Sequence, residues 1–525
     1  MEYRGKEKSK NRSARNKELA SIKNLLQMGN IPTATSEIIK YVEKYPDDEF
    51  GLYQYGKILL RNNRIQEAKE IYQQTANLYG KNRQSALIAL GEIATLERKF
   101  KLACKYFKEA METDCYDNGR AAFLLVRLTR EMGYYYEALQ LLDEIHSFAP
   151  EMQIERAKIL TAIDMNEEAD KVLSTLIPKN KLQEREIAVE KGKIYKARGD
   201  YEQAQIYYEF AKDTDIKDKL YYQALMEQAR LAKQTSNYHQ LVIYGEELYN
   251  ADRTFNGNAN IMLGIGKLGI GEYQSAKNIF ELALEVNDYS CRSQATYYLS
   301  SLQILSGEEK NAEKTLRNYI ENNKVADRLS YIKLIKLLLD QNRLDEARTL
   351  LNEIEQKDKN SQEDYSFIRL RLLLDKKQGK TLPKREENEY VESQIIEYNK
   401  EEAILSTKKY HQTLENDESR FKESIDIEAL FQELQVYLTD ENKLSLGLLD
   451  EYEIPYPNAG YRGNEIYDHI RIIVIPGTKN IISMYPCAKS PLPTKGEYQK
   501  SQEQNKKIGQ KKSTRFEKFF GQTSN

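Results

Sequence analysis

The sequence lacks most of the residues and patterns on which catalytic, metal-binding and membrane assignments depend. Its 525 residues include no tryptophan, four cysteines and four histidines. No apolar run reaches the roughly 18 residues that a membrane-spanning helix needs. The cysteines lie far apart and show no paired metal-ligand spacing: Cys104, Cys115, Cys291 and Cys487. We therefore expect reduced thiols in a cytoplasmic protein, with no metal site and no membrane partner.

Catalytic signatures are equally scarce. There is no GxSxG, Walker or Cys/His nucleophile signature. Gly264, Gly266 and Gly269 match GxGxxG, but a dinucleotide site needs a strand before this motif and the start of a helix after it. Here the motif lies inside a helical pattern, so we interpret the match as accidental. The sequence predicts a non-enzymatic protein without a cofactor.

The charges nearly balance, with 79 Lys and Arg against 81 Asp and Glu. No overall field therefore attracts nucleic acid or a membrane. Only the two ends of the sequence carry a clear excess of one sign of charge. Residues 1–16 are basic without apolar periodicity, which predicts a disordered tail. Residues 491–525 form a second basic tail, which could hold nucleic acid by charge alone.

The dominant positive feature is an alanine that returns every 31 to 37 residues: Ala34, Ala68, Ala103, Ala138, Ala169, Ala204, Ala276, Ala312 and Ala347. One copy has Leu241 at this position. An apolar or aromatic residue follows four positions later in every copy except that one, and a break in the helical pattern precedes the alanine. Because a small residue lets two helices approach closely, the pattern predicts helical hairpins that meet at the alanine.

This pattern, with its period near 34 residues, resembles the tetratricopeptide repeat (TPR). The late proline of that family is present at Pro46 and Pro150, but its early tryptophan is absent throughout. The resemblance implies a mostly α fold, a TPR-like α-solenoid of about ten helical hairpins over residues 17–376. It also implies a scaffold that binds a peptide or protein segment in a concave groove.

The chain after the repeats has a different character. Residues 377–424 read as a charged, partly helical linker, and residues 425–490 read as a small α+β unit. That unit would begin with an amphipathic helix at 424–439. An ordered loop would follow at 453–467, because this stretch is rich in proline and glycine.

The α+β unit would end in a β-hairpin. Residues 470–475 and 480–485 are apolar runs joined by a turn, which is typical of paired strands. Both strands are apolar on both faces and so need cover on each side. The amphipathic helix can supply only one of these covers.

The resemblance also suggests a site. In TPR proteins the position after the small residue of the first helix points into the groove, and basic residues gather there and one turn later: Arg127, Arg130, Lys158, Lys193, Lys196, Arg230 and Lys233. Stacked repeats would align this inner basic row for an acidic peptide or a carboxylate. Alternatively, Glu155, Glu190 and Glu227, each three residues before a member of the row, neutralise it.

A second candidate site lies in the predicted hairpin. His469, Arg471 and Tyr485 would gather on its strands. They loosely resemble the acid–base groups of metal-free ribonuclease toxins of the barnase and colicin type. A binding or structural role for the hairpin is the preferred interpretation.

The sequence is compatible with three functions. The first is a non-enzymatic protein-interaction scaffold with a protein or peptide partner. The second is an RNA-binding or ribonuclease-like protein that acts through its C-terminal unit. The third is a peptide-sensing bacterial regulator, although no helix-turn-helix module precedes the repeats.

Overall fold

The computed structural model describes residues 2–113, 119–145, 149–251, 256–323, 327–362, 364–382, 394–395, 397–413, 419–444, 449–462 and 465–504. They fall into two compact units, Met1–Ile194 and Tyr195–Asn525. The last turn of α11 belongs to the second unit.

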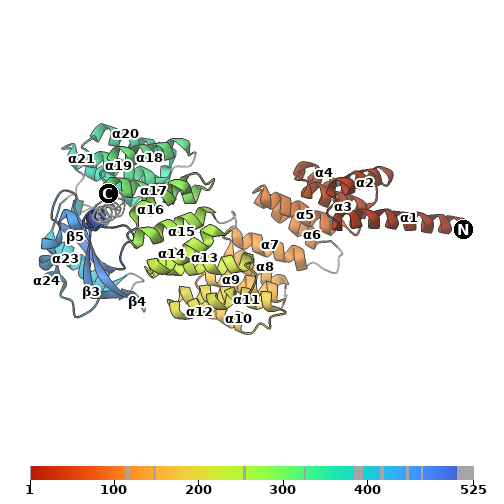
Figure 1. The fold of residues 1–525 in the computed structure, drawn as a ribbon, viewed down its shortest axis with the longest axis horizontal. Coiled ribbons are helices and arrows are strands. Elements are labelled where there is room, and N and C mark those ends of the chain that lie inside the picture. Colours follow the sequence, from red (N-terminus) through yellow and green to blue (C-terminus); the bar gives the residue numbers. More distant parts are fainter. Residues whose placement is uncertain are drawn as a thin grey trace, which may run out of the picture. The chain divides into compact units, whose positions relative to one another are not determined.

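Helices in antiparallel pairs build the first unit (Figure 1). They are α1 (Glu2–Gln27), α2 (Ile31–Lys44), α3 (Glu49–Arg61), α4 (Ile65–Asn77), α5 (Arg83–Leu96), α6 (Phe100–Met111), α7 (Gly119–Glu131), α8 (Tyr135–Ile145), α9 (Pro150–Ala162), α10 (Asn166–Ser174) and α11 (Lys181–Ala197). We call the odd-numbered helices A helices and the even-numbered ones B helices.

The same pairing continues in the second unit. Its repeat helices are α12 (Tyr201–Lys212), α13 (Lys219–Gln234), α14 (Tyr238–Asn250), α15 (Asn256–Gly269), α16 (Tyr273–Leu284), α17 (Tyr289–Leu305), α18 (Glu309–Asn322), α19 (Arg328–Asp340), α20 (Leu344–Lys357) and α21 (Tyr365–Lys377). Ten hairpins run from α1 to α20, as the sequence predicts, and α21 follows as an additional A helix.

A turn precedes each recurring alanine, as the break in the helical pattern predicts. Each turn contains one residue with a left-handed backbone: Gly29, Asn63, Arg98, Gly133, Asp164, Gly199, Ser236, Gly271, Gly307 and Asn342. In the first turn the Asn30 N–H donates to the Leu25 carbonyl at 2.9 Å, which closes the end of α1. A left-handed residue with this bond ends one helix and reverses the chain within a few residues.

Small side chains sit at the crossings of the helices. The recurring alanines of the B helices are all 0 % exposed: Ala34, Ala68, Ala103, Ala138, Ala169, Ala204, Ala276, Ala312 and Ala347. The A helix contributes a matching gap in several hairpins. A Cβ on Gly91 would lie 2.4 Å from Cε1 of Phe107, so the ring occupies the space that the glycine leaves.

In the repeat that lacks the alanine, the small and the large residue of the crossing have exchanged positions. Leu241 stands at the alanine position, and Gly245 follows four residues later where other repeats have a large side chain. A Cβ on Gly245 would lie 2.9 Å from the Cα of Leu263, so α14 packs directly on the backbone of α15. This crossing therefore also combines a small and a large residue, but the large residue comes first along the helix.

The N-terminal segment differs from its prediction. Helix α1 begins at Glu2 and runs through the residues expected to be disordered. The prediction was wrong because it used the lack of an apolar face, which governs packing. Helix formation itself depends on residue type, and this segment contains mainly Lys, Arg, Glu and Ser, with one glycine and no proline.

After the repeats, residues 397–504 form what we call the C-terminal unit. It contains α23 (Lys400–Lys408), a π-helical turn (Lys409–Thr413), α24 (Ile427–Glu433), β1 (Arg420–Phe421), β2 (Lys443–Leu444), β3 (Asp450–Arg462), β4 (Glu465–Val474), β5 (Ile481–Cys487) and a helical segment at 495–504. The strands form an antiparallel sheet of order β1-β3-β4-β5, with β2 also paired to β3.

The hairpin β4–β5 confirms the predicted pair of strands, whereas the predicted loop at 453–467 is wrong. This stretch forms most of β3 and the start of β4. Its prolines are tolerated because the pairing of β3 with β4 shifts register between Pro455 and Gly460. A bulge of this kind removes the need for a ladder hydrogen bond at each proline.

The sheet has a cover on each face. On one face Ile470 and Ile472 pack with Leu430 and Phe431 of α24. The predicted helix at 424–439 is thus shorter, ending as α24 and a 3₁₀ turn (Leu434–Tyr437). On the other face Ile475 and Ile482 share a core with the A helices α19 and α21, whose members include Leu334, Leu338, Leu370 and Leu373. The last repeats are therefore the second cover that the strands require.

Further contacts hold the C-terminal unit on the repeats. Tyr238 donates its hydroxyl to the Lys489 carbonyl at 2.8 Å, and Lys336 donates to the Leu449 carbonyl at 3.1 Å. The rings of Tyr273 and Tyr498 lie 5.1 Å apart. Within the second unit, the repeats and the C-terminal unit thus form one continuous packed body.

The contact between Gly91 and the ring of Phe107 predicts that a glycine-to-alanine substitution within a helix lowers the stability of the protein. In an isolated helix, Gly91→Ala stabilises by up to about 1 kcal/mol. Here the added Cβ collides with Phe107, so we expect a loss of about 1–3 kcal/mol. Urea unfolding followed by circular dichroism measures the difference. In a Phe107→Leu background the same change should cost less, and stabilisation by Gly91→Ala alone would contradict the packing.

Candidate ligand-binding surfaces

The inner basic row lies on the A helices, and its members in the first unit are paired with carboxylates. Arg130 Nε on α7 lies 2.7 Å from Glu155 on α9, and Lys158 lies 3.0 Å from the same carboxylate. Lys193 pairs with Glu190 at 2.9 Å. Arg127 pairs with Glu131 more loosely, at 3.5 Å.

The other three members of the row belong to the second unit. Lys196 pairs with Glu227 on the next A helix at 2.6 Å, and Arg230 pairs with the same glutamate. Lys233 forms no ion pair with any described side chain, and Met262 occupies the position that corresponds to Glu227 one repeat later. Burial lowers the pKa of Lys233. The ion pairs follow the self-neutralising interpretation, and they join successive A helices.

Glu155 is the most buried carboxylate of this row, at 2 % exposure. Burial alone would raise its pKa, but the charges of Lys158 and Arg130 and the hydrogen bonds that they donate outweigh burial and lower it. For Lys158, burial would lower the pKa, but Glu190, Glu155 and Glu186 together raise it. Each partner thus holds the other in its charged form.

A different surface of the first unit has unpaired cations. A cavity of about 590 Å³ opens between the A helices α1 and α3, and we call it the α1–α3 cavity. Its apolar lining comes from Leu19, Ile22, Leu26, Phe50 and Ile58. Lys23, Lys57 and Arg61 also line it, and all three are exposed. Among the side chains that the structure describes, no carboxylate forms an ion pair with any of the three.

Lys57 stands directly after Gly56, at the groove position of its repeat, but the cavity itself was not predicted from the sequence. A usable signal was present. Three residues before Lys57 stands Gln54, where the middle repeats have a glutamate. The missing carboxylate leaves Lys57 with only a ring contact, 5.7 Å from the centre of Tyr53.

The hairpin residues named from the sequence are brought together by the sheet. His469 and Arg471 lie two residues apart on β4, and Tyr485 on β5 is paired with Arg471. Arg471 forms ion pairs with Glu453 at 2.7 Å and with Glu451 at 3.3 Å, and its side chain is 14 % exposed. A guanidinium held by two carboxylates in a buried position is poorly placed to bind an RNA phosphate.

Burial also shifts the pKa values of the other two residues. Burial lowers the pKa of His469 and raises the pKa of Tyr485 to about 12. His469 lines a small cavity of about 210 Å³ with Glu453 and Glu497. Glu497 is already engaged, because it accepts a bond from the Thr494 N–H at 2.9 Å and pairs with Lys489 at 2.7 Å.

Metal and membrane features were sought in the same part of the chain. The described residues contain no cluster of three or more His, Cys, Asp or Glu side chains that could hold a metal ion. None of the described helices combines the length and apolar character needed to cross a bilayer.

Glu155→Gln tests the paired row. Because the pKa of Glu155 is lower in the folded state, its stabilisation is complete above the ordinary carboxyl pKa of 4.5 and is lost as the pH falls through the folded value. We expect a loss of about 3 kcal/mol at neutral pH, which shrinks in acid. Urea unfolding across this pH range measures it. Glu37→Gln, from the exposed pair with Lys40, is the control and should change little. A loss independent of pH would contradict the argument.

Comparison with known proteins adds structural relatives only. No protein-family model matches the chain, and no curated protein matches it. The APC/C hetero-tetramer Cut9–Hcn1 is similar over 68 % of this chain and 75 % of that chain, with 14 % identity and a TM-score of 0.36. A tetratricopeptide repeat protein from Parabacteroides merdae has 15 % identity and a TM-score of 0.36 over 55 % and 99 %.

YrrB, a TPR protein with an unusual peptide-binding site, has 18 % identity and a TM-score of 0.28 over 36 % of this chain and 97 % of that chain. Similarities this low carry no argument about this chain. The fold follows more directly from the buried alanines, the left-handed turns and the repeat length of the chain itself. The ten hairpins from α1 to α20 form an α-solenoid that resembles an array of tetratricopeptide repeats.

Proposed function

We propose that this chain is a non-enzymatic protein-interaction scaffold that binds an acidic segment of a partner protein in the α1–α3 cavity. The observation that supports this proposal is the combination of an apolar lining with three exposed cations that form no ion pair with a described carboxylate. An apolar side chain of the partner would enter the cavity beside Phe50, which is 46 % exposed.

The charges favour an acidic partner. Lys23, Lys57 and Arg61 line the cavity, and none of its described lining residues is acidic. A volume of about 590 Å³ falls in the usual range of ligand sites. Carboxylates of the partner would gain ion pairs here without breaking any that already exist.

The inner basic row is the weaker candidate for the same role. An acidic ligand there would have to displace Glu155 or Glu227, each of which holds two cations. Displacement would leave a buried carboxylate unpaired, which is costly. The row therefore serves to join repeats, and the α1–α3 cavity serves to bind.

A pair of labelled peptides tests the proposal with the full-length protein. One peptide alternates Leu and Phe with Asp and Glu, and its control replaces each acid by Asn or Gln. We expect binding of the acidic peptide only, detected by fluorescence anisotropy and weakened by salt. Lys57→Gln with Arg61→Gln should weaken it about tenfold, because two ion pairs of about 0.7 kcal/mol each are lost.

Lys193→Gln is the matched control, since Lys193 belongs to the inner basic row and is already paired with Glu190. Its effect should be small. Equal binding of both peptides would exclude charge recognition. Weakening by Lys193→Gln, but not by the double variant, would move the site to the inner basic row.

A further inference from the structure

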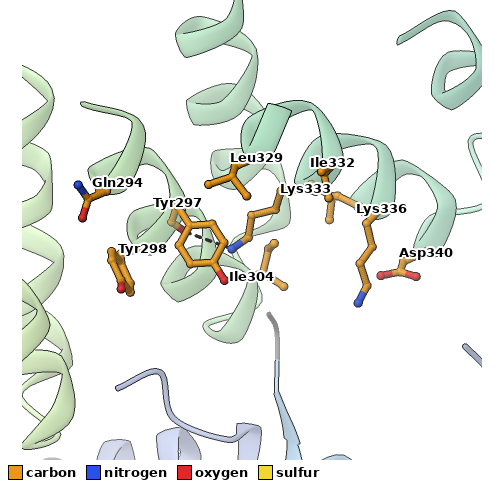
Figure 2. A pocket seen from close by; sticks show the side chains of 10 residues that line it. Gln294, Tyr297, Tyr298, Ile304, Leu329, Ile332, Lys333, Lys336 and Asp340 are labelled. Carbon is orange, nitrogen blue, oxygen red and sulfur yellow. Dashed lines mark hydrogen bonds between the residues drawn. The ribbon is translucent and has the colours of Figure 1, made fainter. Parts of the chain in front are cut away.

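A second cavity lies in the second unit, between the A helices α17 and α19. It has a volume of about 400 Å³, and we call it the α17–α19 cavity. Its walls are largely apolar and aromatic, with Tyr297 and Tyr298 on α17 and Leu329 and Ile332 on α19 (Figure 2). Lys333, Lys336 and Asp340 are the charged residues that line it.

Lys333 is an unusual residue for such a place. It is only 7 % exposed, and no described carboxylate forms an ion pair with it. Its Nζ donates to the Tyr297 carbonyl at 3.1 Å and to the Ser301 hydroxyl, and it lies 3.8 Å from the centre of the Tyr297 ring (Figure 2). These groups stabilise an ammonium, but none of them carries a negative charge.

A buried cation without a counter-ion is expensive. Lys336 differs from Lys333 because carboxylates act on it. Burial lowers the pKa of Lys336, and the charges of Asp340, Asp450 and Glu451 offset part of that shift. Burial lowers the pKa of Lys333 far below its ordinary value, and Lys336 lowers it further. Without a counter-ion Lys333 therefore favours its uncharged form, and a carboxylate bound beside it would favour the ammonium.

We infer that the α17–α19 cavity binds a small organic monocarboxylate with an apolar body, whose carboxylate supplies the counter-ion that Lys333 lacks. The apolar body would lie between Tyr298, Leu329 and Ile332. A single negative charge fits best, because Asp340 on the wall and the nearby Asp450 and Glu451 would repel a dianion.

The C-terminal unit favours a small molecule over a protein segment. Lys336, on the cavity wall, donates to the Leu449 carbonyl, so the C-terminal unit already lies against this side of the cavity. The remaining volume of about 400 Å³ is at the lower end of the range for small-molecule sites. A bound carboxylate would consequently stabilise the second unit in proportion to its saturation.

The test uses the full-length protein with 4-phenylbutyrate and its neutral amide. We expect the acid to raise the thermal unfolding midpoint in a concentration-dependent manner and to give a titration heat, while the amide does neither. Lys333→Met keeps the volume and removes the charge. It should weaken binding of the acid at least tenfold and leave the midpoint of the free protein equal or higher, because an apolar side chain replaces a buried amine that has no counter-ion. Lys314→Met, at an exposed position on α18, is the control.

Leu329→Trp provides a second route, because Leu329 is 53 % exposed on the cavity wall and a larger side chain can fill the cavity without disturbing the core. It should abolish binding while Lys333 remains. Equal binding of acid and amide, or no binding of the acid, would overturn the inference. So would unchanged binding by Lys333→Met together with a lower midpoint, since Lys333 would then serve only to join α17 and α19.

Discussion

The close approach of two helices at a small side chain is the contact on which the rest of the repeat region depends. Each recurring alanine of the B helices, and Gly245 in the one repeat that lacks this alanine, is small enough for two helices to approach closely. Rings such as that of Phe107 then fill the gap left by a glycine on the A helix. This packing sets the spacing of the A helices, so residues about one repeat apart become neighbours.

That neighbourhood decides the electrostatics of the A-helix surface. Where a glutamate stands three residues before the groove position, as at Glu155 and Glu227, it binds a cation of its own helix and one of the preceding A helix. Where Gln54 or Met262 stands instead, Lys57 and Lys233 form no ion pair with any described side chain. The residue three positions before the groove position thus decides whether the cation forms an ion pair between A helices.

The C-terminal unit depends on burial of both faces of its sheet. Its sheet is apolar on both faces, so it needs α24 on one side and the repeats on the other. Within the sheet, the pairing of β3 with β4 places Arg471 beside Glu451 and Glu453 in a buried position. The unit also contacts Lys336, which lines the α17–α19 cavity.

The sequence by itself determined the repeats, their turns, the buried alanines and the hairpin β4–β5, because each depends on local spacing along one or two adjacent elements. It missed the helix at residues 2–16 and strand β3, since rules based on apolar faces and prolines ignore residue propensity and bulges. Only the tertiary structure decided which cations are paired, what covers the second face of the sheet, and where the cavities lie. These features join residues one repeat or more apart, and a local pattern contains no information on such distances.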